Sequence, residues 1–337
     1  MAKMKAMVAQ APGEAFTLVE RDVPEPGPGQ VRIQVEACGI CHSDAFVREG
    51  LWPELEYPRI PGHEVAGRVD AVGEGVSGFE VGERVGVGWH GGHCFTCRPC
   101  REGDFISCES AQICGISYDG GYAEYMVTPE GAVARIPAEL DAVAAAPLMC
   151  AGITTFNALR NSGARAGDVV AVEGIGGLGH LGIQYAARMG FHVVALSRGP
   201  EKKELALELG AHRYVDTKAE NGVEVLQSLG GAQVILETAP SAEAATAIFD
   251  GLGRDGRLIL VGAGMEPIQV GALQMIGGRK GLAGWASGTA VDSEDTMKFS
   301  ALTGVETRIE SFPLAEANEA YERMITNAAR FRVVLVP

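Results

Sequence analysis

Alternation of hydrophobic and polar residues in the first part of the chain predicts short β-strands. Residues 31–37 alternate strictly, which is typical of a strand with one buried face. Segments of the same kind occur at 65–69, 81–87 and 121–127, and glycine and proline separate them. This part of the chain, up to about residue 137, is therefore predicted to be β-rich, in the form of a partly closed barrel.

After about residue 150 the pattern changes to short apolar runs that alternate with helical periodicity. The runs 168–173 and 191–196 suit buried parallel strands, and the segments 178–189 and 202–209 have helical spacing and end before glycine. Strands that alternate with helices at this spacing indicate a doubly wound parallel sheet. Further elements are predicted at 234–236 and 257–261 (strands), 314–327 (an amphipathic helix) and 332–336 (a strand).

Length and charge narrow the class of protein. A chain of 337 residues is typical of about two domains, and its net charge of −15 disfavours nonspecific binding to nucleic acid or to an anionic membrane. No apolar stretch of about 18 residues occurs, so no membrane span is expected. The first residues lack the apolar segment of a signal peptide, which favours a cytoplasmic protein.

Half of the eight cysteines lie in one segment with the pattern Cys-x2-Cys-x2-Cys-x7-Cys. Four thiolates at this spacing can hold one tetrahedral ion, usually zinc. The last gap of seven residues differs from the ferredoxin pattern, and cysteines two residues apart are awkward to pair as disulfides. We therefore predict a closed structural zinc site, which stabilises and does not catalyse. Its ligands are Cys94, Cys97, Cys100 and Cys108.

A glycine-rich turn follows the predicted strand 168–173 and begins the helix after it. It matches G-x-G-x-x-G, whose glycines let the backbone approach a pyrophosphate at the helix N-terminus. The predicted contacts of this turn with a dinucleotide are Gly174, Gly176, Gly177, Leu178 and Gly179.

The end of the next strand distinguishes the two nicotinamide cofactors. An NAD-binding protein places Asp or Glu there for the ribose 2′-hydroxyl, and this chain has Ser197 and Arg198 instead. A hydroxyl and a guanidinium group would hold a 2′-phosphate, which a carboxylate would repel. NADP(H) is therefore predicted in preference to NAD(H).

Spacing alone does not select the ligands of a second metal ion. A lone cysteine or histidine is more often structural than a ligand. The candidates outside the four-cysteine segment are cysteines 38, 41, 114 and 150 and histidines 42, 63, 90, 93, 180, 192 and 212.

Over essentially its full length the chain resembles the zinc-dependent medium-chain alcohol dehydrogenases. The motifs that carry the resemblance include Cys38-Gly39-Ile40-Cys41-His42-Ser43-Asp44, Pro61-Gly62-His63-Glu64 and Cys150-Ala151-Gly152-Ile153-Thr154-Thr155, with the four-cysteine segment and the glycine-rich turn. The resemblance implies a GroES-like catalytic domain and a Rossmann dinucleotide-binding domain. Their expected ranges are 1–152 with 290–337 for the catalytic domain, 90–110 for its zinc lobe, and 153–289 for the Rossmann domain.

The resemblance also implies a catalytic zinc ion bound by Cys41, His63 and Cys150, with Glu64 as an occasional extra ligand. Zinc would act as a Lewis acid on the substrate oxygen while hydride passes to or from nicotinamide. Asp44 is expected to orient His63 through a hydrogen bond.

Other roles are implied residue by residue. Ser43 matches the hydroxyl that takes the alcohol proton. Many family members have a histidine three residues later, where this chain has Phe46, so the proton is predicted to leave through the cofactor ribose hydroxyl. Further expected cofactor contacts are His42, Thr154, Lys202, Val261 and Arg332, and the expected pocket residues are Phe46, Trp52 and Trp89.

The sequence therefore predicts an NADP(H)-dependent zinc alcohol dehydrogenase or aldehyde reductase that acts on a small, primary alcohol or aldehyde. The alternatives are a polyol or secondary-alcohol dehydrogenase of the same fold, an NAD(H)-using enzyme, and a zinc-binding scaffold protein. The resemblance implies a homo-dimer or homo-tetramer, in which subunits pair near residues 276–289.

Overall fold

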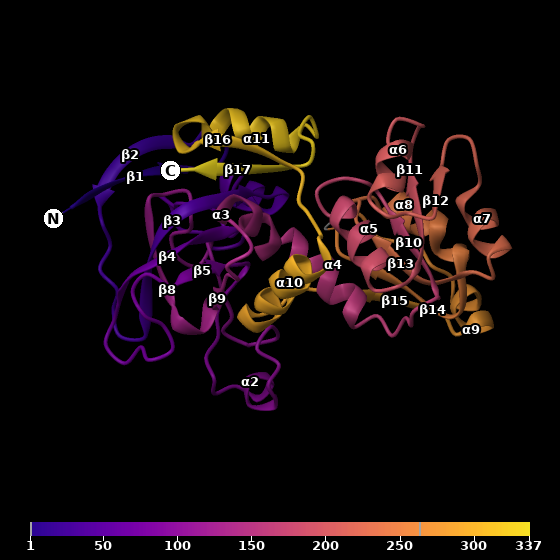
Figure 1. Ribbon diagram of the computed structural model, residues 1–337, viewed down its shortest axis with the longest axis horizontal. Helices are drawn as coiled ribbons and strands as arrows, with labels where there is room; N and C mark the ends of the chain where they lie inside the picture. Colours follow the sequence, from indigo (N-terminus) through magenta and orange to yellow (C-terminus); the bar gives the residue numbers. More distant parts are fainter. Residues whose placement is uncertain (1, 263) are drawn as a thin grey trace. The chain divides into compact units, whose positions relative to one another are not determined.

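A computed structural model describes residues 2–262 and 264–337, and the chain forms two compact units. Unit 1 contains Met1–Ile153 and Gly288–Pro337, and unit 2 contains Thr154–Ser287. In Figure 1 the first and last colours of the sequence scale meet within unit 1, because the chain returns to this unit after completing unit 2.

Unit 1 is built on a largely antiparallel sheet with the strand order β16-β17-β3-β4-β5-β9, and β8 pairs with β3. Its strands are β3 (Gln30–Ile40), β4 (Val65–Val72), β5 (Arg84–Val87), β8 (Tyr125–Pro129), β9 (Val133–Arg135), β16 (Ile309–Pro313) and β17 (Arg332–Val336). The two-stranded sheets are β1 (Lys3–Val8) with β2 (Thr17–Asp22), and β6 (His90–Gly92) with β7 (Gln112–Ile113).

The helices of unit 1 are mostly short. They are η1 (His42–Asp44), α1 (Ala45–Arg48), α2 (Arg98–Glu102), η2 (Glu130–Ala132), α3 (Ala142–Ala145), η3 (Ala146–Met149), α10 (Ala290–Thr303), η5 (Leu314–Glu316) and α11 (Ala317–Ile325). The helix α4 (Ala151–Arg160) begins in unit 1 and ends in unit 2.

Most predicted elements of unit 1 are confirmed, and two strand starts are corrected. The strand predicted at 81–87 begins at Arg84, because residues 81 and 82 form a turn in which Gly82 has φ +94°. The strand predicted at 121–127 begins at Tyr125, because the N–H groups of Gly121 and Tyr122 donate to the turn at Pro61 and Gly62.

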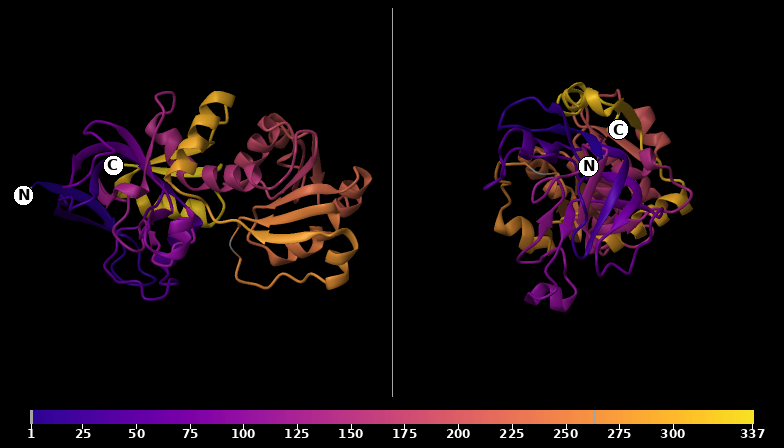
Figure 2. Two further views of the ribbon diagram at one scale, coloured as in Figure 1. Left: turned by 90° about the horizontal axis from the view of Figure 1, so that it is seen from below. Right: turned by 90° about the vertical axis from the view of Figure 1, so that its left-hand side faces the viewer.

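Unit 2 is a six-stranded sheet with the order β12-β11-β10-β13-β14-β15, and every pair of neighbouring strands is parallel. Figure 2 shows these strands side by side. The order reverses at β10, which confirms the predicted doubly wound sheet. The strands are β10 (Val169–Glu173), β11 (His192–Ser197), β12 (Arg213–Asp216), β13 (Ala232–Glu237), β14 (Leu252–Leu260) and β15 (Gly281–Gly284).

Helices connect the strands of unit 2 and include both predicted ones, α5 and α6. They are α5 (Gly179–Arg188), α6 (Lys203–Glu208), α7 (Gly222–Ser228), α8 (Ala242–Ile248), η4 (Phe249–Gly251) and α9 (Ala272–Gly278). Among the described residues, no single helix has the length and hydropathy to cross a membrane. One bent pair, Ala142–Met149 with Ala151–Arg160, meets those two criteria together.

Candidate metal centres and cofactor-binding turn

The pairing of β3 with β4 brings two separate segments of unit 1 together. The strands are antiparallel, with Cys38 opposite Val65, so the residues after β3 lie beside those that precede β4. Cys41 follows the end of β3, and His63 and Glu64 come directly before β4. The Gly39 N–H donates to the Glu64 carbonyl (2.9 Å), which fixes the two segments where their functional side chains emerge.

Cys150 reaches the same place from a third segment. It follows η3, which contacts β3, β4 and β5. Met149 is fully buried against the backbone at Gly86 and Gly88, and a side chain at either glycine would collide with it. These two glycines therefore allow the end of η3 to approach the sheet and deliver Cys150.

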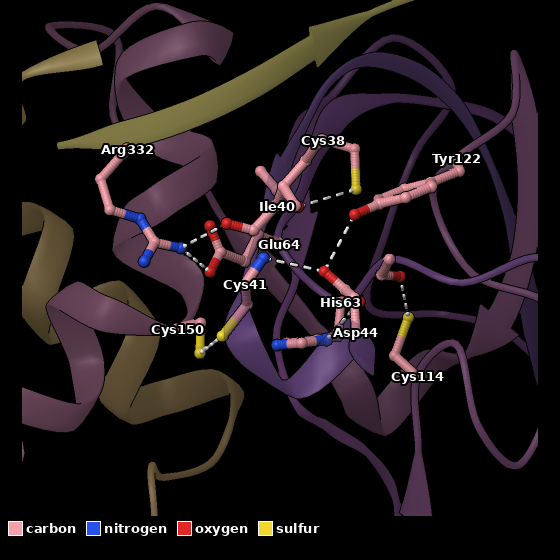
Figure 3. A network of polar contacts seen from close by, with 12 residues as sticks. Cys38, Ile40, Cys41, Asp44, His63, Glu64, Cys114, Tyr122, Cys150 and Arg332 are labelled. Atoms are coloured by element: carbon pink, nitrogen blue, oxygen red, sulfur yellow. Dashed lines mark hydrogen bonds and ion pairs between the residues drawn. The ribbon is translucent and has the colours of Figure 1, made fainter. Parts of the chain in front are cut away.

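Figure 3 shows that the side chains of Cys41, His63, Glu64 and Cys150 converge. Their ligand atoms all lie within 4.8 Å of one another, and the two sulfur atoms are 3.8 Å apart. We call this group the assembled site. The structure thus brings together four candidate ligands that come from three separate parts of the sequence.

Asp44 lies behind His63 and faces its imidazole ring. The Asp44 Oδ1 is 3.3 Å from His63 Nδ1, and both side chains are about 2% exposed. The Oδ2 of Asp44 accepts hydrogen bonds from the Cys41 N–H (2.8 Å) and the Tyr122 hydroxyl (2.9 Å). The carboxylate therefore fixes His63 with Nδ1 toward Asp44 and Nε2 toward the other candidate ligands.

Burial and neighbouring charges set the protonation of this cluster. The hydrogen bond with Cys150 holds the pKa of Cys41 well below its usual range, while the same contact and burial raise the pKa of Cys150. Burial opposes protonation of His63, but Asp44 and Cys41 outweigh it and raise the pKa of His63. Burial raises the pKa of Glu64 to about 7, although Arg332 opposes that shift.

The assembled site fits a zinc ion. Its donor set of two sulfurs, one imidazole nitrogen and one carboxylate is the kind that zinc prefers. The His63 Nε2 and Glu64 Oε2 are buried and have no hydrogen-bond partner among the described residues. Because a buried polar atom without a partner is costly, a cation among these four side chains would satisfy both.

Arg332 contacts Glu64 in this structure. β17 pairs with β3 so that Val333 lies opposite Ile40, which brings the preceding Arg332 beside the assembled site. The guanidinium group is buried, forms an ion pair with the Glu64 carboxylate and donates to the Ile40 carbonyl (3.2 Å). Sequence reasoning did not predict this pairing, because the two residues are 268 positions apart.

The three aromatic residues predicted to line a pocket form one row that ends at His63. The ring of Trp89 packs edge-on against His63 with centroids 4.9 Å apart, and Trp52 lies 6.0 Å from Trp89. Phe46 continues the row at 5.7 Å from Trp52. Ser43 is half-buried in η1, next to the exposed His42. The wall beside the candidate ligand His63 is therefore apolar.

The four-cysteine lobe, residues 94–108, forms a compact second cluster. Its ligand atoms also lie within 4.8 Å of one another. The N–H groups of Thr96 and Cys97 point at the Cys94 sulfur, at 3.4 and 3.3 Å, and the Cys94 N–H points at the Cys108 sulfur at 3.3 Å. The Thr96 hydroxyl and the N–H groups of Cys97 and Thr96 lower the pKa of Cys94 to about 6, which favours the thiolate that binds a metal.

In unit 2 the glycine-rich turn, residues 174–179, adopts a backbone conformation that requires glycine at two positions. Gly174 has φ +88°, and a side chain at Gly179 would collide with the Gly174 carbonyl. The Thr238 hydroxyl donates to the carbonyls of Glu173 (2.9 Å) and Gly174 (3.1 Å). Lys202 donates to the Ile175 carbonyl (2.7 Å), so this predicted cofactor contact lies at the turn.

The other predicted cofactor contacts of unit 2 occupy strand ends and one helix. Ser197 ends β11, and the exposed Arg198 follows it. Val261 follows β14, and its N–H donates to the Glu237 carbonyl. Thr154 is buried in α4.

Two carboxyl groups lie inside unit 2 at the ends of adjacent strands. Glu173 of β10 and Glu237 of β13 are register neighbours, and both are buried. One oxygen of each has no hydrogen-bond partner among the described residues. Burial raises the pKa of Glu173 to about 7, and burial with the nearby Glu173 raises that of Glu237 to about 8.

Comparison with known proteins identifies both parts of the chain. Residues 27–138 match the family model described as the alcohol dehydrogenase GroES-like domain, and residues 177–303 match that of zinc-binding dehydrogenases. The alcohol dehydrogenase patD of Penicillium expansum is 44% identical over 98% of this chain and 97% of its own. An alcohol dehydrogenase of Geobacillus stearothermophilus is 38% identical over 98% of this chain and 99% of its own.

Solved structures of related dehydrogenases have a fold similar to that of this chain. The cobalt- and zinc-bound thermostable alcohol dehydrogenase of Pyrobaculum aerophilum is similar with a TM-score of 0.89 and 30% identity, and both chains are covered completely. The CAD of Helicobacter pylori in complex with NADP(H) has a TM-score of 0.88 and 29% identity, over 99% of this chain and 98% of its own.

Proposed function

Because this chain belongs to the medium-chain zinc-type alcohol dehydrogenases, we propose that it interconverts a small primary alcohol and its aldehyde with NADP(H) as the hydride carrier. The single observation that carries the proposal is the convergence of four ligand atoms from three segments within 4.8 Å. The proposed pocket residues Trp52 and Trp89 lie in an apolar row that ends at one of these candidate ligands, His63. Such a wall favours an apolar substituent on the substrate and keeps water away from the reacting carbon.

Each residue of the assembled site has a role in this proposal. Cys41, His63 and Cys150 would hold zinc, with Glu64 as a further ligand. When bound, zinc would supply a Lewis acid that polarises the substrate oxygen. Asp44 fixes the imidazole, and Ser43 takes the alcohol proton. With Phe46 three residues later, that proton would leave through the cofactor ribose hydroxyl rather than through a side chain.

Most of the proposed cofactor contacts lie in unit 2, at the turn 174–179 and at Ser197, Arg198, Lys202, Val261 and Thr154. The carrier would supply or accept hydride at its nicotinamide ring. His42 and Arg332 of unit 1 are proposed contacts of the pyrophosphate. The preference for NADP(H) is supported by the exposed Arg198 and by the lack of an acid at the end of β11. The nearby Asp216 carboxylate accepts the N–H groups of Gly199 (2.7 Å) and Lys218 (2.9 Å), and the dipoles of these two groups partly offset its negative charge.

An activity assay tests the reaction class. The zinc-loaded chain is incubated with NADPH or NADH and with panels of primary aldehydes, ketones and polyol-derived carbonyls. We expect the highest kcat/KM for a primary aldehyde with NADPH. Preference for ketones or polyols would favour the alternative dehydrogenases of this fold, and no turnover with any substrate would refute the function.

A substitution tests the cofactor choice. Arg198→Asp should lower kcat/KM for NADPH about 10- to 100-fold, because a hydrogen bond to a charged group contributes about 1.5–3 kcal/mol and 1.4 kcal/mol is a factor of ten. NADH should change much less. Arg254→Asp makes the same charge change at a side chain that is 79% exposed and serves as the control. Equal losses for both cofactors would contradict the assignment of Arg198.

We further propose a cytoplasmic homo-dimer or homo-tetramer. None of the eight cysteines, all within the described residues, forms a disulfide, which suits a reducing compartment. In unit 2, β15 is an edge strand, and Leu273 and Ile276 of the preceding α9 are 84% and 71% exposed. An exposed edge with apolar neighbours supports pairing there. Light scattering would measure the assembly, and a monomer would refute this part.

A further inference from the structure

We propose that the Tyr122 hydroxyl is a positioning group of the assembled site, acting on His63 through Asp44. This inference rests on the proposed metal-binding role of His63, but it does not depend on which alcohol or cofactor is used. Tyr122 donates to Asp44 Oδ2 at 2.9 Å, and it is completely buried. Figure 3 shows its hydroxyl pointing at the carboxylate from the side opposite the ligands.

The two oxygens of Asp44 are used differently. Oδ2 is held by two groups that bind no metal, the Tyr122 hydroxyl and the Cys41 N–H (2.8 Å). Oδ1 faces His63 Nδ1 at 3.3 Å. Two donors on one oxygen fix the plane of the carboxylate, so the other oxygen meets the imidazole in one orientation. Without the hydroxyl, only the single N–H would define that plane.

Tyr122 is anchored to the turn that presents His63. Its N–H donates to the Pro61 carbonyl (3.0 Å), and its carbonyl accepts from the Met7 N–H (2.8 Å). The ring lies against Gly62, which has φ +102°, and a side chain at Gly62 would collide with that ring. The donor hydroxyl and the ligand that it orients are therefore held by the same backbone turn.

The hydroxyl remains a donor at working pH. Burial and the neighbouring Asp44 charge raise the pKa of Tyr122 well above its usual value, so the proton stays on the oxygen that faces the carboxylate. The alternative is that this hydroxyl only stabilises the core of unit 1. A core role would change stability and would leave the metal unaffected.

The chain offers a matched control in Tyr321. Both tyrosine rings pack edge-on against Phe16, at 5.7 Å for Tyr122 and 5.6 Å for Tyr321. Tyr321 is 2% exposed, and its hydroxyl has no hydrogen-bond partner among the described residues. Tyr321→Phe therefore removes a buried hydroxyl from the same core cluster without touching Asp44.

The experiment compares Tyr122→Phe, Tyr321→Phe and the unaltered full chain, each loaded with zinc or with cobalt. Zinc release to a chromogenic chelator, the cobalt absorption spectrum, kcat, KM and thermal unfolding are measured. For Tyr122→Phe we expect the affinity of the assembled site to fall about 3- to 10-fold, which is less than the 10- to 100-fold loss typical when the direct hydrogen-bond partner of a metal ligand, here Asp44, is removed. Its cobalt spectrum should shift, and the zinc of the four-cysteine lobe should stay bound.

A double-mutant cycle with Asp44→Ala tests the route of the effect. If Tyr122 acts through Asp44, removing its hydroxyl in the Asp44→Ala background should change metal affinity less than about twofold. Metal affinity and cobalt spectra of Tyr122→Phe that match those of Tyr321→Phe would overturn the proposal. Weakened metal binding in a chain that oxidises no alcohol would refute the proposed function and leave this inference intact.

Discussion

The four-cysteine lobe takes all of its candidate ligands from one segment, residues 94–108, whereas the assembled site takes its candidate ligands from residues 41, 63, 64 and 150. In the lobe, backbone N–H groups of neighbouring residues point at the sulfurs. In the assembled site, the ligands meet only because β3, β4 and η3 pack together. The lobe can therefore organise locally, while the assembled site depends on the fold of unit 1.

The largest expected effect comes from breaking the assembled site. Cys150→Ser should lower alcohol oxidation about 10³-fold or more, because Lewis-acid stabilisation of the transition state contributes several kcal/mol and each 1.36 kcal/mol is a factor of ten. Bound zinc should fall from two ions per chain to one, with little change in the unfolding temperature. Metal analysis, kcat and calorimetry measure these quantities. Full activity with a single zinc ion would contradict the assignment of the two sites.

The next prediction concerns a substitution of one cysteine in the four-cysteine lobe. Cys97→Ser should also remove one zinc ion, but its main effect should be a free energy of unfolding that is lower by about 4 kcal/mol or more, because loss of a bound metal is among the causes of the largest single-substitution effects. The folded fraction should keep most of its kcat, because no lobe cysteine belongs to the assembled site. If this variant lost activity as completely as Cys150→Ser while unfolding normally, the division of roles would be wrong.

The same difference explains what the sequence could predict. Ligand spacing was sufficient for the lobe, and periodicity was sufficient for the doubly wound sheet, because both signals are local. For the assembled site, spacing left eleven candidates open, and only the resemblance selected Cys41, His63 and Cys150. Tyr122 and the partner of Arg332 were missed, since nothing near either residue in the sequence shows which strand will lie beside it.

The buried carboxyl groups of the two units also differ in their partners. Glu64 is paired with Arg332, whereas Glu173 and Glu237 of unit 2 adjoin each other and each has one oxygen without a partner among the described residues. Their pKa values of about 7 and about 8 lie above the ordinary 4.5 of the unfolded chain. The neutral forms therefore stabilise the fold fully below about pH 4.5, and this stability is lost as the pH rises through 7 and 8.

Glu237→Gln should remove much of that pH dependence. Because glutamine is neutral and similar in shape, the difference in unfolding free energy between pH 5 and pH 8 should shrink by about 3 kcal/mol. Denaturant unfolding at several pH values measures it. Glu204→Gln neutralises an exposed carboxyl of the same unit and should leave the dependence of the unfolding free energy on pH unchanged. Equal slopes for Glu237→Gln and the unaltered chain would show that the buried pair does not titrate in this range.

The smallest expected effect concerns the segment that delivers Cys150. Asp141 caps α3 by accepting the Ala144 N–H (2.7 Å), and η3 continues from α3 to Cys150. Asp141→Ala should cost about 1 kcal/mol of stability and speed zinc loss from the assembled site, because its third ligand is held less firmly. Asn221→Ala removes a comparable cap from α7 in unit 2, with a similar cost and no effect on either zinc ion. Timed chelator release separates the two sites, and faster release from the lobe in Asp141→Ala would show that its zinc also depends on distant packing.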